Sequence, residues 1–122
     1  MSLMSVTLEG EASAFRPGDT IQAVAEWDLP GVPQGIVAAL IWTAGSGGPH
    51  TEEGVAVSVS IDRPKSRERR LFELQAPSGP YSYRGKLFSI GWVLEVRAEP
   101  SGPSGRLEIV IGPGAAPLVA RG

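Results

Sequence analysis

The longest apolar run of the chain lies between Tyr83 and Glu99, and it reads YRGKLFSIGWVLEVRAE. Every second residue in its later part is apolar, namely Phe88, Ile90, Trp92, Leu94, Val96 and Ala98. A period of two places these side chains on one face of a strand, whereas a helix would repeat them every 3.6 residues. An unbroken strand of this length would extend roughly 55 Å at about 3.3 Å per residue. That exceeds the usual strand, so the run predicts a bend or bulge at Gly85 or Gly91.

Six further runs share this extended character, and turn residues separate them. In Thr20–Leu29 the apolar side chains alternate with Gln22, Glu26 and Asp28, which is typical of a half-buried antiparallel strand. Ile36–Thr43 is apolar on both faces and predicts a strand in the middle of a sheet. The other four runs are Leu3–Glu9, Val55–Ile61, Arg69–Ala76 and Arg106–Ile111.

About seven antiparallel strands without a long helix predict an all-β, two-layer β-sandwich. A chain of 122 residues accommodates one hydrophobic core. We expect a single domain over residues 1–112 and a flexible C-terminal tail over residues 113–122. Large side chains on the inward faces should be buried, namely Trp27, Trp42, Phe88, Ile90 and Trp92.

The composition excludes several kinds of chemistry. There is no cysteine, so disulfides, thiolate zinc sites and cysteine nucleophiles are excluded. The net charge of −2 is too small to indicate a nucleic-acid partner. No apolar run approaches the length of a membrane span, and the first residues lack the pattern of a signal peptide. We therefore expect a soluble cytoplasmic protein without a transmembrane segment.

Two segments carry a resemblance to a known family. Phe15–Ile21 is an aromatic-x-Pro-Gly-acidic turn that leads into a strand, and Pro80–Trp92 contains the sequence PYSYRGKLFSIGW. Both are similar to the N-terminal half of arrestin-fold proteins, a group that includes arrestins, a retromer subunit and bacterial sporulation-control proteins. The resemblance implies an immunoglobulin-like sandwich that acts as a scaffold or adaptor. The chain departs from arrestins in having one sandwich, in lacking a counterpart of their buried charged network, and in carrying Trp92 where tyrosine or phenylalanine is expected.

The candidate catalytic and ligand-binding motifs are weak. The glycines of 45–48 lack the lysine and the helix that follow in a phosphate-binding loop, so they predict a hairpin turn. His50, Glu52 and Glu53 offer one imidazole and two loop carboxylates, which is a poor metal or acid–base site. No Gly-x-Ser-x-Gly elbow is present. We expect no catalytic residue, no cofactor and no metal.

The concentrated charge of the chain lies in the segment Asp62–Arg70. Arg67 and Arg69 should share one face of a strand, while Arg70 should join Phe72 and Leu74 on the other. A solvated hairpin is therefore the first interpretation. If the segment binds a partner, that partner should be anionic, because arginine pairs well with phosphate and carboxylate groups. The candidate contacts are Arg63, Lys65, Arg67 and Arg69.

These observations favour a non-enzymatic, arrestin-like protein-binding or scaffold module. The alternative is a carbohydrate- or ligand-binding sandwich that serves as an accessory domain, and an enzyme comes third. A sugar binder should expose a tryptophan beside a groove, and an enzyme should gather titratable groups in a cleft. We expect a protein partner and, as a further hypothesis, a homodimer through a sheet edge or face. Leu3–Glu9 and Tyr83–Glu99 have few charges that would oppose such pairing.

Overall fold

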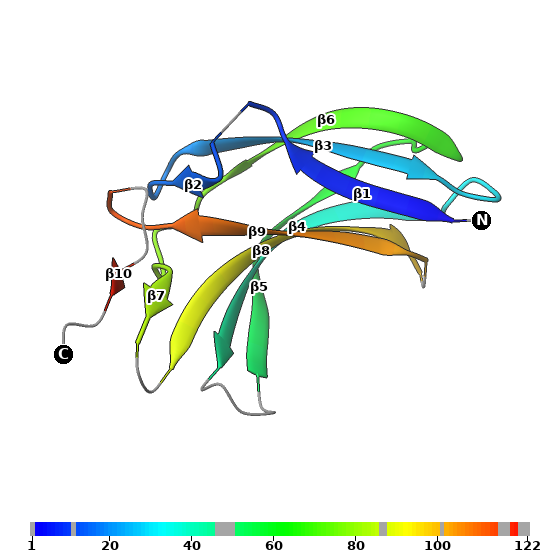
Figure 1. Cartoon of the computed structure of the whole chain (residues 1–122). Helices are drawn as coiled ribbons and strands as arrows, with labels where there is room; N and C mark the ends of the chain where they lie inside the picture. Colours follow the sequence, from blue (N-terminus) through cyan, green and yellow to red (C-terminus); the bar gives the residue numbers. More distant parts are fainter. Residues whose placement is uncertain are drawn as a thin grey trace.

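The computed structural model describes residues 2–10, 12–45, 51–85, 88–100, 102–114 and 118–119. These residues form strands and turns without a helix, and the strands make two facing layers (Figure 1). The strands are β1 (Leu3–Leu8), β2 (Ala14–Phe15), β3 (Thr20–Asp28), β4 (Gly35–Gly45), β5 (Thr51–Ile61), β6 (Arg67–Gln75), β7 (Tyr83–Arg84), β8 (Ser89–Glu99), β9 (Ser104–Ile111) and β10 (Leu118–Val119). The two-layer, all-β sandwich predicted from the alternation is confirmed.

The smaller sheet has the order β1-β3-β6, with antiparallel pairing throughout. Its central strand β3 has Ile21, Ala23 and Ala25 on the inner face, and all three are buried. The polar residues Gln22 and Glu26 lie on the other face and are exposed. The period of two in the sequence therefore corresponds directly to the two faces of this sheet.

The larger sheet follows the order β10-β7-β8-β4-β5, and β9 also pairs with β8. Strand β8 has β4 along its whole length on one side. On its other side it pairs with β7 at Ser89 and Ile90, and with β9 from Trp92 to Arg97. The long apolar run of the sequence is thus the middle of the sheet. It cannot supply the open edge that its low charge suggested, because both of its edges are already paired.

The predicted interruption of the run Tyr83–Glu99 is confirmed at Gly85. Strand β7 ends at Arg84, the Gly85 N–H donates to the Phe88 carbonyl at 3.0 Å, and β8 begins at Ser89. A side chain at Gly85 would collide with the Tyr83 ring, since a Cβ there would lie 2.4 Å from it. Glycine is therefore required at this turn. Gly91, the alternative position, lies within the continuous strand β8.

The core fills the space between the sheets. Trp27 and Trp92 are each 1% exposed, as predicted. Trp42 and Ile90 are only half-buried. The prediction for Phe88 is wrong, since this side chain is 48% exposed. Phe88 precedes β8, so its ring stacks on that of Tyr83 with centroids 5.1 Å apart and does not enter the core.

The sequence did not indicate the three two-residue strands. β2 pairs in parallel with the end of β9, and β10 pairs in parallel with β7. Strand β10 lies within the segment expected to be a tail. The division into a domain over residues 1–112 and a flexible tail over residues 113–122 stays a prediction.

Candidate functional site

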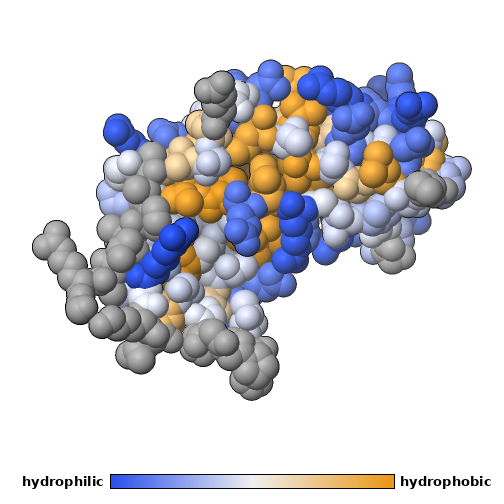
Figure 2. All heavy atoms as spheres, viewed as in Figure 1, coloured by the Kyte–Doolittle hydropathy of each residue, from blue (hydrophilic) through white to orange (hydrophobic). Residues whose placement is uncertain are grey.

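The outer face of the larger sheet carries apolar side chains that the core does not use. One cross-strand row joins Val55 of β5, Ile41 of β4 and Val93 of β8. Val55 is 63% exposed, and Val93 is half-buried. Together with Val37 and Ala39, which lie on the same face of β4, these residues form what we term the outer apolar patch. In the view of Figure 2, hydrophobic side chains gather near the middle of the molecule between hydrophilic ones.

A depression of about 310 Å³ lies over this patch. Apolar side chains of the patch line it together with Gly54, Ser58 and the charged residues Glu53, Glu95, Arg97 and Arg106. An apolar surface with a charged border is the arrangement found in protein–protein contacts, where water leaves the centre and the rim stays solvated. The residues are brought together by strand register, since they come from four strands that are far apart in the sequence.

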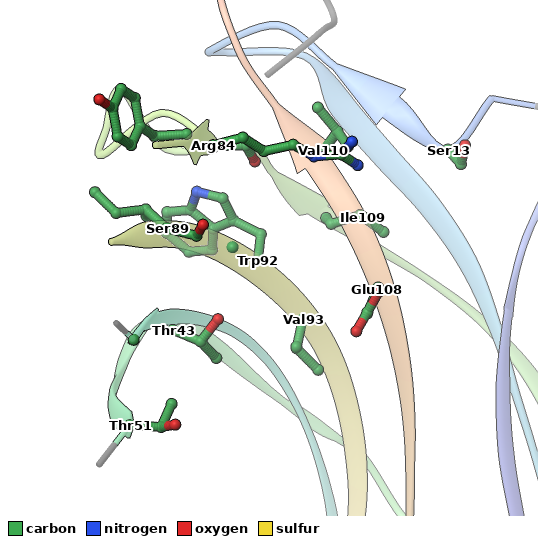
Figure 3. A pocket seen from close by; sticks show the side chains of 15 residues that line it. Ser13, Thr43, Thr51, Arg84, Ser89, Trp92, Val93, Glu108, Ile109 and Val110 are labelled. Atoms are coloured by element: carbon green, nitrogen blue, oxygen red, sulfur yellow. The ribbon is translucent and has the colours of Figure 1, made fainter. Parts of the chain in front are cut away.

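A larger depression of about 710 Å³ lies at one end of the same sheet, between β7 and the strands β8 and β9. Figure 3 shows the Arg84 side chain reaching from β7 toward Val110 of β9, with Glu108 further along the same strand. Most of the other polar groups are hydroxyls, including those of Ser13, Thr43 and Thr51. Hydroxyls without a nearby base or metal are not activated as nucleophiles.

In the part of the chain that the structure describes, the titratable groups that converge at a depression are acids paired with arginines. No group of three or more acidic or histidine side chains there could hold a metal ion. His50 and most of the glycine-rich turn at 45–48 lie outside the described residues. Of the predicted cluster, only Glu52 and Glu53 can be placed, and Glu53 is bound to Arg106.

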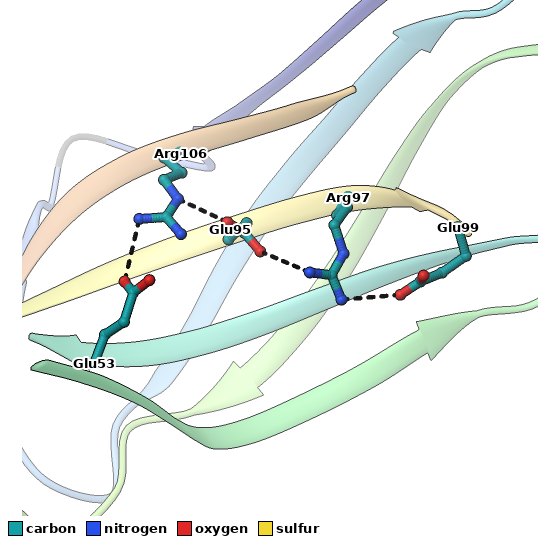
Figure 4. Close-up of polar contacts among 5 residues, drawn as sticks. All are labelled: Glu53, Glu95, Arg97, Glu99 and Arg106. Atoms are coloured by element: carbon teal, nitrogen blue, oxygen red, sulfur yellow. Dashed lines mark hydrogen bonds and ion pairs between the residues drawn. The ribbon is translucent and has the colours of Figure 1, made fainter. Parts of the chain in front are cut away.

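A chain of ion pairs crosses the rim of the patch (Figure 4). Arg106 Nε donates to Glu95 Oε2 at 2.7 Å, and Arg106 Nη1 lies 3.4 Å from Glu53 Oε2. The hydrogen bond that Arg106 donates to Glu95, and then the one that it donates to Glu53, raise the pKa of Arg106 above its usual value. Arg97 continues the chain, with Nη2 donating to Glu99 Oε1 at 3.0 Å. These groups satisfy one another. Since Arg106 of β9 reaches Glu53 of β5 across β8 and β4, the ion pairs also cover part of the patch, where Ile41 is only 5% exposed.

Little in the sequence indicates this network. Glu95 and Arg106 lie directly opposite each other in the β8–β9 pairing, and Glu95 is only 8% exposed. A charged residue in the middle of a buried run was the available hint, because charges are seldom buried without a partner. The identity of the partner depends on the register, which the sequence alone did not give.

The basic segment Asp62–Arg70 forms the connection from β5 to β6 and the first part of β6. Its four candidate contacts are exposed, but the structure does not gather them into one site. Arg67 Nε lies 3.9 Å from Asp28 Oδ2, and Arg69 is opposite Glu26 in the strand register. The candidates on the turn itself are Arg63 and Lys65.

Glu68 organises this turn. Its carboxylate accepts a hydrogen bond from the Lys65 backbone N–H at 3.0 Å and another from Arg70 at 2.7 Å. The bond from Lys65, and then that from Arg70, lower the pKa of Glu68. Arg70 also donates to the Asp62 carbonyl, so its side chain is held on the turn by hydrogen bonds. The predicted separation of Arg70 from Arg67 and Arg69 agrees with the alternating exposure of β6.

The tryptophans serve the fold. Trp27 Nε1 donates to the Lys65 carbonyl, and Trp92 Nε1 donates to the Pro80 carbonyl, each at 2.7 Å. Trp42 packs against the core, and its ring covers Gly54 so closely that a Cβ there would lie 2.7 Å away. None of the three is the exposed platform that stacking on a sugar requires. This arrangement counts against the carbohydrate-binding alternative.

Comparison with known proteins identifies the fold. No protein-family model and no curated protein sequence matches this chain. The crystal structure of Spo0M, a sporulation control protein from Bacillus subtilis, is similar, with a TM-score of 0.64 and 15% sequence identity. The match covers 90% of this chain and 49% of Spo0M, so the chain spans about half the length of that protein. The fold is arrestin-like, as the sequence resemblance implied. No helix in the described residues is long and apolar enough to cross a membrane.

Proposed function

We propose that this chain is a non-enzymatic, arrestin-like binding or scaffold module, and that a protein partner contacts the outer apolar patch. The observation that supports this proposal is the apolar row Val55–Ile41–Val93 on the outer face, where Val55 is 63% exposed, Val93 is half-buried and Ile41 is buried. The inner faces of both sheets form the core, so this row is a second apolar surface. Uncovered apolar patches with polar rims are typical of interaction sites.

The state of the titratable groups also favours binding over catalysis. The acidic groups at the smaller depression are held in ion pairs with Arg97 and Arg106. An acid–base catalyst needs a group with a pKa tuned toward neutrality and free to exchange a proton. Among the residues that the structure describes, Glu68 and Arg106 have shifted pKa values, and both are shifted in the opposite sense, away from neutrality.

The test of the patch uses Val93, which is half-buried and lies near its centre. A partner is first identified by crosslinking and affinity purification, and its affinity for the full chain is measured by calorimetry. Val93→Glu is expected to weaken binding by roughly tenfold or more, because a carboxylate would be desolvated in an apolar contact. The matched control is Leu71→Glu, at an exposed apolar position on β6 of the smaller sheet. Equal affinity of the Val93→Glu variant and the native chain would rule out the patch.

The basic segment remains a separate proposed contact for an anionic partner, such as a phosphorylated or acidic peptide. All four candidates, Arg63, Lys65, Arg67 and Arg69, are exposed. Exposed charge contacts are screened over about 8 Å at physiological salt, so binding through this segment should weaken as salt rises.

The Arg67→Gln/Arg69→Gln variant is expected to abolish binding of such a peptide and to leave the melting temperature nearly unchanged, because exposed ion pairs contribute little to folding. Fluorescence titration of a labelled phosphopeptide at low and high salt measures this effect. Arg16→Gln makes the same change at an exposed position in a different turn and serves as the control. If the double variant binds as the native chain does, the basic segment is not a contact.

A further inference from the structure

Strand β5 is an open edge of the larger sheet. It pairs with β4 over Thr51–Ile61, and among the described residues no strand pairs with its other side. The backbone N–H and C=O groups along that side are therefore available to a further strand.

Of the other long strands at the borders of the sheets, β6 is charged and β1 is covered. β6 carries a series of charges at its edge, which oppose the addition of a strand. β1 and β9 approach each other closely, since a Cβ at Gly105 would lie 3.0 Å from the Met4 carbonyl oxygen. By contrast, residues 54–60 of β5 contain no charge, and Val55, Ala56, Ser58 and Ser60 are all exposed.

The charges at the two ends of β5 are of opposite sign. Glu52 and Glu53 lie at its start with a charge of −2, and Asp62, Arg63 and Lys65 follow its end with a net charge of +1. If two copies of β5 align antiparallel, the acidic start of each lies near the basic end of the other. The two-fold symmetry of such a dimer produces this contact twice. A parallel alignment would bring like charges together. The strand is therefore complementary to itself in one direction only.

The register of two paired β5 strands follows from the position of the β-bulge in β5 and from the two faces of the strand. The pairing of β4 with β5 shifts between Leu40 and Ile41, where Ala56 is the residue left over, so the regular part of β5 is Val57–Ile61. Its midpoint is Val59. Antiparallel pairing about Val59 sets Val57 opposite Ile61 and Ser58 opposite Ser60, which keeps inner side chains with inner and outer with outer.

We propose that two copies of this chain form a symmetric dimer in which their β5 strands pair antiparallel about Val59, so that the larger sheets of the two copies become one continuous sheet. The partner is a second copy because the charge pattern of β5 complements that of β5 itself. This dimer goes beyond the proposed function, and it forms whether or not another protein binds the outer apolar patch.

The test changes the charges at the exposed pair Ser58 and Ser60. In the Ser58→Lys/Ser60→Lys variant, each new lysine lies directly opposite a lysine of the partner copy, and like charges in that position are destabilising. In Ser58→Lys/Ser60→Glu, each lysine lies opposite a glutamate. Sedimentation of the full chains over a concentration series should show a dimer for the native chain. The double lysine variant should have a dimer dissociation constant raised roughly tenfold or more. The lysine–glutamate variant should remain a dimer.

A second measurement checks the register. The chain has no cysteine, so Val59→Cys introduces a single thiol that should form a disulfide-linked dimer under mild oxidation, whereas Leu71→Cys on β6 should not. A native chain that sediments as a monomer at its highest attainable concentration overturns the proposal, and so does equal dimerisation of the two charge variants. Comparing a partner's affinity for the two charge variants separates the two ideas, because both carry the same lysine at Ser58, which lines the depression over the patch, and they differ only at Ser60.

Discussion

Replacing Trp92 by alanine is expected to unfold the domain. Trp92 is 1% exposed, and its indole N–H donates to the Pro80 carbonyl at 2.7 Å. Its neighbours across the sheet are Trp42 of β4 and Ile109 of β9, so it lies where the central strand meets the core. Truncating a buried tryptophan costs about 3–5 kcal/mol. The whole stability of a domain is only about 5–15 kcal/mol, so the loss removes a large part of it.

The effect is measured by urea denaturation followed by far-UV circular dichroism. Trp92→Phe, which keeps an aromatic ring but removes the hydrogen bond to Pro80, should lose less stability than Trp92→Ala. Phe88→Ala is the control, because Phe88 is 48% exposed and stacks only on Tyr83. If the alanine variant unfolds at the same urea concentration as the native chain, Trp92 is not part of the core.

The comparison of Trp92 with Phe88 shows what alternation in a sequence can and cannot predict. Both residues have the same parity in the run Tyr83–Glu99, so the pattern assigned both to the core. The pattern holds only while the chain remains in one strand. The turn at Gly85 ends that strand, and Phe88 falls before the start of β8. The glycine predicted the interruption, but not that Phe88 would lie outside the core.

The candidate sites were harder to predict, because they depend on which strands are neighbours. The outer apolar patch combines Val55, Ile41 and Val93, and the rim joins Glu95 to Arg106, all through cross-strand register. Local sequence sets the face on which a residue lies, but not the strand opposite. For the same reason the sequence suggested the run Tyr83–Glu99 as an edge with few charges, whereas β5 is an open edge and this run is not.

Replacing Gly105 by valine is expected to separate β1 from β9 and to destabilise the domain by about 1–3 kcal/mol, the usual cost of inserting atoms into a packed interior. Gly105 lies opposite Val96, which is fully buried, so a side chain there would point between the sheets. A Cβ at Gly105 would lie 3.0 Å from both the Met4 carbonyl oxygen and the Ser5 Cα. Both are backbone atoms, so a rotamer change cannot relieve the clash and β1 as a whole must move.

This displacement should loosen β1 before the whole domain unfolds. β1 pairs with β3 alone, so the backbone hydrogen bonds of Met4 and Val6 should lose protection from hydrogen exchange more than those of β4, which has a strand on each side. Gly35→Ala is the matched control, because a Cβ at Gly35 meets only the Glu99 Cβ at 4.0 Å, an ordinary contact. The control should keep the native denaturation midpoint. If the Gly105→Val variant also keeps the native denaturation midpoint, then the close approach of β1 and β9 does not hold the sandwich closed. In that case β1, like β5, is an edge open to pairing.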